Sequence, residues 1–214
     1  MASRSGDGVE TLAASLEARA VTGASAQEPE SDDFRLVDAA RQGDRAAFGR
    51  LYDRYARMVH GILLGRVPPC EVDDLVHDTF LQALRQLHTL RDSTRFGAWL
   101  AAITRNRAND YHRRAVEEVE LPENLSAEGA GVRVSVSAPN QDQEAADLLA
   151  AIRELPETYR EPMLLRLVEG MTGPEIAART GLTSGSVRVN LCRGMQQLRE
   201  RLARRSRAPQ AGPV

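Results

Sequence analysis

The sequence predicts an all-α protein in which two helical domains are joined by a flexible acidic linker. In two long blocks, apolar residues recur every three or four positions, the spacing that places them on one face of a helix. The acidic segment between these blocks contains prolines and glycines, which interrupt helices. With 214 residues, 42% of them hydrophobic, the chain is long enough to form two cores.

The first domain is predicted to span residues 34–114. Residues 1–33 are mostly small or acidic, and we expect them to form a disordered or loosely structured extension. Breaks in the helical pattern fall near Gly43 and at residues 68–69 (PP). A fourth helix is expected after residues 92–94 (DST), which are good N-cap types. The third helix carries an apolar stripe made of Val72, Val76, Phe80, Ala83 and Leu87.

The linker is predicted over residues 115–147, the second domain over 148–205 and a short tail over 206–214. Acidic residues dominate the linker, and its one alternating patch, residues 132–136 (VRVSV), is too short and isolated to make a sheet. Apolar residues at helical spacing resume at residue 148 and continue to about residue 205.

Charge is segregated along the chain. The formal net charge is −5 for residues 1–33, +5 for 34–114, −7 for 115–147 and +5 for 148–214. All 28 basic residues are arginines, which suit forked contacts with phosphate and guanine. The basic blocks are therefore candidates for nucleic-acid binding, although ordinary solvated surface has the same composition.

Composition argues against several other classes of protein. The two cysteines, Cys70 and Cys192, are far apart and have no CxxC partner, which indicates neither a disulfide framework nor a zinc site. We expect no membrane insertion, since the apolar stretches are shorter than the ~20 residues that cross a bilayer. The N-terminus lacks the features of a secretory signal. A cytoplasmic bacterial protein without a metal or another cofactor is the simplest interpretation.

A helix-turn-helix is predicted between residues 171 and 202. Residues 172–175 (TGPE) fit the capping-box pattern, and Gly181 stands where a helix C-cap favours glycine. Thr183 or Ser184 can cap a second helix whose apolar stripe starts at Val187, leaving a polar outer face. A plain antiparallel helix pair is the alternative, but the caps and the polar face together favour a DNA-recognition helix.

Both domains resemble parts of one family. Residues 71–80 (EVDDLVHDTF) and 96–103 (FGAWLAAI) resemble sigma region 2, and residues 155–157 (LPE) with the helix-turn-helix resemble sigma region 4. The order of these motifs, with only a linker between them, is similar to extracytoplasmic-function (ECF) RNA polymerase sigma factors. The resemblance implies promoter-specific transcription initiation without catalysis.

The resemblance also implies where the chain binds its partners. The polymerase, through its clamp coiled coil and its flap, and promoter DNA are the implied partners, and an anti-sigma factor is a fair expectation. The outer part of the third helix is the candidate polymerase-binding face, although acidic residues there could simply be solvated; it contains Asp73, Asp74, Asp78 and Leu81. Phe96 and Trp99 are expected in the core, rather than as platforms for unpaired bases.

Two sets of residues are candidates for promoter contacts, because amide and guanidinium groups can bind bases and phosphates. For the −10 element they are Arg105, Asn106, Asn109, Asp110, Arg113 and Arg114. For the −35 element they are Ser184, Ser186, Arg188, Asn190 and Arg193.

Two alternatives stay open at this point. A stand-alone helix-turn-helix repressor or activator would use the first domain for dimerisation or ligand binding. A metalloenzyme is the other alternative, because Asp74, His77 and Asp78 have helical spacing that could hold a metal, with His60, His88 and His112 elsewhere. No HExxH, phosphate-loop or nucleophile–base motif supports catalysis.

Overall fold

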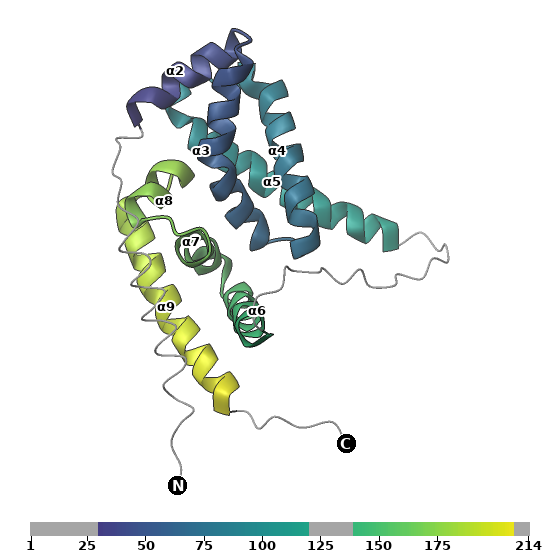
Figure 1. Ribbon diagram of the computed structural model, residues 1–214, viewed down its shortest axis with the longest axis vertical. Coiled ribbons are helices and arrows are strands. Elements are labelled where there is room, and N and C mark those ends of the chain that lie inside the picture. Colours follow the sequence, from purple (N-terminus) through teal and green to yellow (C-terminus); the bar gives the residue numbers. More distant parts are fainter. Residues whose placement is uncertain (1–29, 120–138, 208–214) are drawn as a thin grey trace.

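The computed structural model describes residues 30–119 and 139–207, and every regular element within these ranges is helical, which confirms the predicted fold class. Figure 1 shows helices α2 to α5 in one bundle, with helices α6 to α9 beside it. The first bundle contains α2 (Glu30–Arg41), α3 (Arg45–Leu64), α4 (Val72–Gln86) and α5 (Phe96–Val119). The second contains α6 (Pro139–Arg153), α7 (Glu157–Leu167), α8 (Gly173–Thr180) and α9 (Ser184–Arg207). Short 3-10 turns, η1 (Pro69–Glu71), η2 (Leu87–Thr89) and η3 (Ser93–Arg95), lie in the first bundle.

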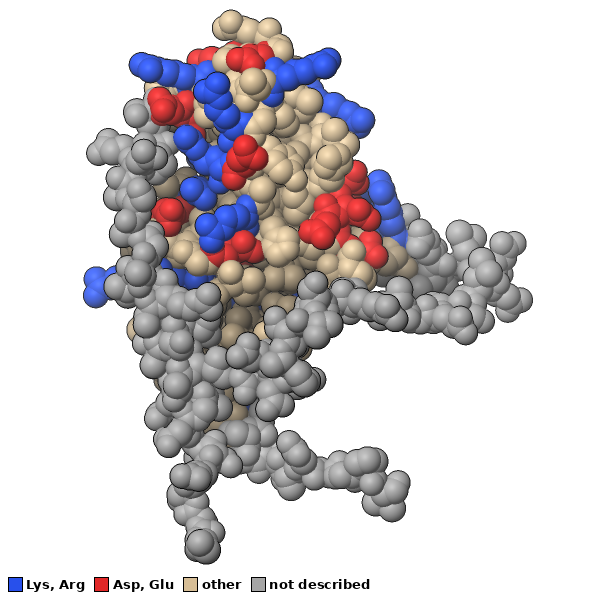
Figure 2. Space-filling model, in the orientation of Figure 1, with Lys and Arg blue, Asp and Glu red and all other residues tan. Residues whose placement is uncertain are grey.

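Helix α3 is the central helix of the first bundle and contacts α2, α4 and α5. It begins after Gly43, whose φ of 95° makes the turn, and Asp44 accepts hydrogen bonds from the first free N–H groups of the helix. The predicted stripe on α4 faces inward, and its Phe80 packs against Tyr52 with the rings tilted and 4.4 Å between their centroids. On the outer side, Figure 2 shows acidic side chains gathered where α4 begins.

Three helix ends differ from the sequence prediction. Helix α2 begins at Glu30 rather than at residue 34, and Asp33 accepts hydrogen bonds from Arg54 and Tyr55 of α3. Helix α5 continues to Val119, since no glycine or proline follows residue 114 before residue 122.

Helix α6 already begins at Pro139, whose fixed φ suits the first helical turn. The outer parts of the predicted linker are therefore helical. The remaining residues of the predicted extension, linker and tail, which are 1–29, 120–138 and 208–214, lie outside the described residues.

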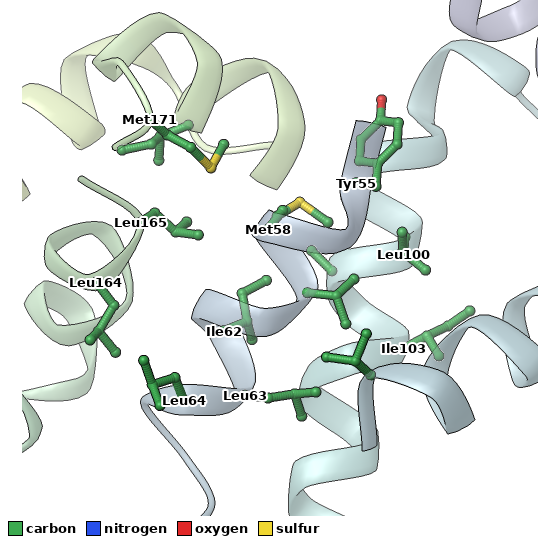
Figure 3. Packing of buried hydrophobic residues seen from close by; sticks show 14 of the residues in the cluster. Tyr55, Met58, Ile62, Leu63, Leu64, Leu100, Ile103, Leu164, Leu165 and Met171 are labelled. Atoms are coloured by element: carbon green, nitrogen blue, oxygen red, sulfur yellow. The ribbon is translucent and has the colours of Figure 1, made fainter. Parts of the chain in front are cut away.

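The two bundles pack directly against each other, which the sequence did not predict. We call this contact, of α3 and α5 with α7 and α8, the interdomain seam. Figure 3 shows Leu164 and Leu165 of α7, together with Met171, facing the side of α3 that carries Met58 and Ile62. All five side chains are at most 2% exposed, so the seam is an apolar core in its own right.

Glycines allow this close approach. A Cβ atom on Gly61 would lie 2.8 Å from Leu165 Cδ2, and one on Gly65 would lie 2.7 Å from Leu164 Cδ1. Farther along the seam, a Cβ atom on Gly97 of α5 would lie 2.7 Å from the backbone oxygen of Arg179. Such contacts are shorter than van der Waals distance, so larger residues would push the two bundles apart.

Candidate nucleic-acid interface

The outer face of α4 is acidic near the start of the helix and apolar farther along it. Asp73, Asp74 and Asp78 are all exposed, and the Leu81 side chain, one turn farther on, is 41% exposed. Sequence reasoning missed Leu84, which is 46% exposed and lies three residues after Leu81 on the same side of the helix. The helical spacing alone could have identified it. An exposed leucine pair beside carboxylates is a face suited to a basic, amphipathic partner.

One member of this face is already paired. Arg107 of α5 donates a hydrogen bond to Asp78 Oδ2, and the Asp78 side chain remains 51% exposed. The Arg107 side chain is 19% exposed, and its Nε atom is buried without a hydrogen-bond partner. The pair therefore joins the α4 face to the helix that carries the −10 candidates.

The −10 candidates lie along the outer half of α5 but in unequal environments. Asn106, Asn109, Arg113 and Arg114 are exposed. Asp110 accepts a 2.8 Å hydrogen bond from Arg113, so it orients an arginine rather than offering a free acceptor. The four exposed side chains supply amide and guanidinium donors on a solvent-facing surface.

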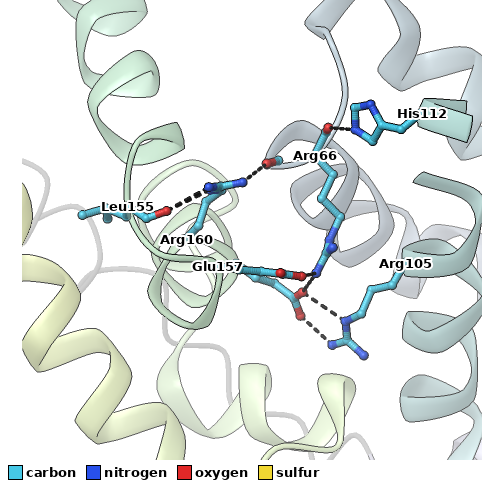
Figure 4. Close-up of polar contacts among 8 residues, drawn as sticks. Arg66, Arg105, His112, Leu155, Glu157 and Arg160 are labelled. Atoms are coloured by element: carbon cyan, nitrogen blue, oxygen red, sulfur yellow. Dashed lines mark hydrogen bonds and ion pairs between the residues drawn. The ribbon is translucent and has the colours of Figure 1, made fainter. Parts of the chain in front are cut away.

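Arg105 is the exception among the −10 candidates, because its guanidinium lies in the interdomain seam. It donates to Glu161 of α7 through Nη2 at 2.6 Å and Nε at 3.1 Å. Arg66 Nη2 lies 3.4 Å from the same carboxylate. Figure 4 shows the polar contacts around Arg66 and Arg105. Hydrogen bonding to Glu161, opposed by burial, raises the pKa of Arg105 above its ordinary value.

The aromatic residues at the start of α5 belong to the core, as expected. Phe96 is fully buried and contacts Tyr55 edge to face, with ring centroids 5.1 Å apart. Trp99 is half-buried and packs on Phe96 at 5.8 Å. These contacts hold the first turn of α5 in place.

The helix-turn-helix has the predicted caps. Thr172 and Glu175 form a reciprocal capping box at the start of α8, and Gly181 ends that helix with a φ of 76°. Burial acts against ionisation of Glu175, but its hydrogen bonds from Thr172 and the nearby arginines hold its pKa below the ordinary value. Thr183 caps α9 by accepting a hydrogen bond from the Ser186 N–H at 3.1 Å.

The outer face of α9 carries the −35 candidates. Ser184, Ser186, Arg188 and Arg193 are exposed, and Asn190 is half-buried. Val189, 45% exposed beside them, was not among the predicted contacts; an apolar side chain there can contact a thymine methyl group. Behind this face, Val187 and Leu198 are buried and fix α9 on the rest of the domain.

The described residues contain no group of three or more His, Cys, Asp or Glu side chains placed to hold a metal ion; Asp74, His77 and Asp78 form none. In the same ranges, no helix combines the length and apolar character that crossing a membrane requires.

Comparisons with known proteins place both bundles in one family. Residues 51–117 match the family model of sigma-70 region 2, and residues 145–198 match that of sigma-70, region 4. The chain is 30% identical over 175 residues to the ECF RNA polymerase sigma-E factor of Escherichia coli (strain K12), in a match that covers 78% of this chain and 92% of that protein. The chain belongs to the ECF RNA polymerase sigma factors. As a member of this family, which is not one of catalytic enzymes, the sigma factor binds core RNA polymerase and directs promoter-specific transcription initiation.

Two further relatives agree with this assignment. The sigma factor is 35% identical over 176 residues to the ECF RNA polymerase sigma factor BldN of Streptomyces coelicolor. The match covers 79% of this chain and 66% of that protein. It is similar in fold to a chain in the structure of CnrH in complex with the cytosolic domain of CnrY, at 27% identity and a TM-score of 0.56. This match covers 81% of this chain and 99% of that chain.

Proposed function

We propose that the sigma factor divides its task among three helical faces. The face of α4 docks on core polymerase, α5 contacts the −10 element and α9 contacts the −35 element. One observation carries this proposal. Each face is exposed to solvent, and each lies on a different helix that is held in place by buried residues. Residues 34–114 then act as the polymerase-binding and −10 domain, and residues 148–205 act as the −35 domain.

On α4, the acidic side chains steer a basic partner and the leucines provide apolar contact. Among the described residues, Asp73 and Asp74 form no salt bridge, whereas Asp78 already binds Arg107. Charge complementarity of this kind accelerates association and excludes wrong partners. We assign this face to the clamp coiled coil and propose that the second domain contacts the flap.

On α5, Asn106 and Asn109 offer donors and acceptors to exposed base edges, while Arg113 and Arg114 suit backbone phosphates. Arg105 and Asp110 complete the set, Asp110 by orienting Arg113. On α9, Arg188 and Arg193 suit phosphate or guanine, and Asn190 suits adenine. Ser184 and Ser186, at the start of α9, suit phosphate contacts near the helix N-terminus.

The sigma factor has no catalytic role of its own in this scheme, needs no cofactor and acts in the cytoplasm, where polymerase and promoters meet. A protein of the anti-sigma class is a further proposed partner. Its support is the complex of CnrH, a protein of similar fold, with the cytosolic domain of CnrY.

The test is run-off transcription with purified bacterial core polymerase, with and without the full chain, on fragments of its own genome. We expect discrete transcripts only when the chain is added. Asp74→Arg should weaken polymerase binding at least about a hundredfold, because like charges across an interface cost several kcal/mol. The matched control is Asp53→Arg, which makes the same charge change at an exposed position on α3 and should leave binding intact.

Unchanged binding by Asp74→Arg would remove α4 as the docking face. If no transcript appeared, polymerase failed to co-purify and the chain alone bound duplex DNA, a stand-alone regulator would replace the proposal.

A further inference from the structure

The first turns of α9 carry a line of small and apolar residues on their outer surface. Figure 1 shows α9 at the edge of the second bundle, and Val187 of this helix is buried against that bundle. At about 100° per residue, Gly185, Val189 and Cys192 fall within about 60° of arc on the side opposite Val187. All three are exposed, and we call them the outer line.

Arginines stand on both sides of the outer line. Arg188 and Arg193 are exposed and lie about 140° apart around the helix axis, with the outer line between them. The sequence has no acidic residue between Glu175 and Glu200. A surface that is basic along both edges and apolar along its middle fits a groove with phosphates at its rims and base edges at its floor. This charge pattern favours the major groove of DNA as the partner of the outer line.

Gly185 is a glycine that the fold does not require. A Cβ atom on it would meet only Thr183 Oγ1, at 4.0 Å, and its φ is not positive. By contrast, a Cβ atom on Gly194 of the same helix would lie 2.8 Å from Met163 Cγ, so packing explains that glycine. Glycine is also a poor helix former. The missing side chain at residue 185 is therefore suited to the close approach of a molecule outside the fold.

Val189 lies one turn beyond Gly185 on the same side of α9. Side chains on a helix lean toward its N-terminus, so the Val189 methyl groups extend over the turn that contains Gly185. Val189 is 45% exposed, although its side chain is wholly apolar. The missing Cβ atom of Gly185 leaves room for one more methyl group against the Val189 side chain.

Thymine is the base that offers such a methyl group. Among the four bases, only thymine carries one on its major-groove edge. The N-terminal residues of a recognition helix contact the base edges, so Gly185 and Val189 lie in the part of α9 that can reach them. Because the valine side chain is short, the helix must lie close to the base that it contacts, and Gly185 permits this approach.

We infer that Gly185 and Val189 form a subsite for one thymine of the −35 element. The 5-methyl group of this thymine packs against the Val189 side chain, in the space that a side chain at residue 185 would fill. This inference rests on the proposed role of α9 and names a base that α9 selects. Val189 supplies the contact, and Gly185 supplies the clearance.

The test uses the assembled holoenzyme and a promoter recovered by run-off transcription. Each thymine of the −35 element, on either strand, is replaced in turn by deoxyuridine, which lacks only the 5-methyl group. Binding by the wild type should fall about fourfold at one position, the effect of about one buried methyl group. Val189→Ala should abolish this difference between thymine and uracil at that position.

Val168→Ala is the matched control for the contact. Val168 follows α7 in the same domain and is likewise 45% exposed, so both substitutions remove the same atoms from a surface valine. Val168→Ala should keep the wild-type preference for thymine over uracil. If both variants lost the preference, or if Val189→Ala kept it, the subsite would be wrong.

Gly185→Ala tests the clearance. Its new Cβ atom takes the space of the thymine methyl group, so binding to the thymine duplex should weaken at least about fivefold. Deoxyuridine at the same position should restore most of the binding, because it leaves room for the added carbon. The preference of the wild type for thymine over uracil is then reversed, which a merely destabilised helix would not produce.

Gly49→Ala is the matched control for the clearance. Gly49 is an exposed glycine within α3, and a Cβ atom on it would meet nothing within 4 Å. Both substitutions should raise the melting temperature slightly, because alanine is the better helix former. Only Gly185→Ala should change DNA binding; an equal effect of the two on binding would overturn the inference.

The outcomes separate this inference from the proposed function. If the holoenzyme depends on its −35 element but no exchange of thymine for uracil changes binding, the thymine subsite is wrong and the −35 role of α9 stands. A −35 element without any A·T pair would likewise overturn the subsite. If altered −35 templates and Arg193→Ala also left binding unchanged, the proposed function of α9 would fail instead.

Discussion

The two helices that carry the proposed DNA contacts, α5 and α9, differ in what covers them. On α9, Arg188 and Arg193 project from a face that is open to solvent, backed by the buried Val187 and Leu198. On α5, the Arg105 side chain is 29% exposed and bound to a carboxylate of the other domain. Under the proposed function, arginine therefore has one role on α9, in DNA contact, and two on α5, where Arg105 also docks the other domain.

This difference teaches that exposure of a predicted contact residue depends on the state of the whole chain. The helix-turn-helix is complete within its own domain, because its capping box and C-cap are local. By contrast, the environment of Arg105 on α5 depends on Glu161 of the other domain. Mutations on α9 should consequently change promoter recognition alone. Mutations at Arg105 should change both promoter recognition and the packing of the two domains.

The largest effect is expected for Arg105→Ala. Removal of the guanidinium leaves Glu161 with Arg66 alone, at 3.4 Å, and should destabilise the interdomain seam by about 1.5–3 kcal/mol, the range for hydrogen bonds to charged groups. Spin labels on the exposed Cys70 and Cys192, which lie in η1 and α9 on opposite sides of the seam, should move apart in pulsed electron paramagnetic resonance, while −10-dependent transcription falls. In a double mutant with Glu161→Gln, the seam should open little beyond either single variant. Strict additivity of the two changes would show that the residues act independently.

Arg193→Ala should have the next largest effect, on DNA alone. Loss of a base-edge arginine costs about 1–3 kcal/mol and should weaken recognition of the −35 element. Promoter binding by the assembled holoenzyme, measured on templates altered in one element at a time, checks this result. The −10 preference and the spin-label distance should not change. An equal loss at both elements would contradict the assignment of one element to each domain.

The smallest effect is expected from pH, through His60. Its hydrogen bond to Glu169, opposed by burial and aided by the charges of Glu169 and Asp73, raises the pKa of His60 above the ordinary value of 6.5. This pair therefore stabilises the interdomain seam fully below about pH 6.5, and its contribution is lost as pH rises through the raised pKa of His60. Solvent screening keeps the effect modest, since the His60 side chain is 38% exposed.

The spin-label distance should lengthen on going from pH 6 to a pH above the raised pKa. His60→Gln removes the titrating group, while Arg57, which also faces Glu169, keeps its charge throughout. A pH response that survives in His60→Gln would assign it to another group.

Much of each domain could be predicted from sequence. The apolar stripe of α4, the core position of Phe96, the break at Gly43 and the caps of α8 depend on residues within a few positions of one another. Helical periodicity and capping chemistry act over this range, so both can be predicted from the sequence directly. The order of the sigma motifs likewise sufficed to indicate the family.

Helix ends were less predictable than helices. The sequence suggested a linker from residue 115, but α5 continues to Val119 and α6 begins at Pro139. Acidic composition favours a loop only weakly, while an uninterrupted helix continues until a breaker stops it.

The amino-acid sequence by itself determined an all-α fold, two candidate DNA-binding helices and a face on α4 that combines aspartates with an exposed leucine. Only the tertiary structure decided that Glu161 binds Arg105, 56 positions away, and that Glu169 binds His60, 109 positions away. Such pairs depend on how two finished domains dock, which here depends on gaps left by Gly61, Gly65 and Gly97. A glycine in the sequence shows that a side chain is missing, and only the folded chain shows which neighbour takes its space.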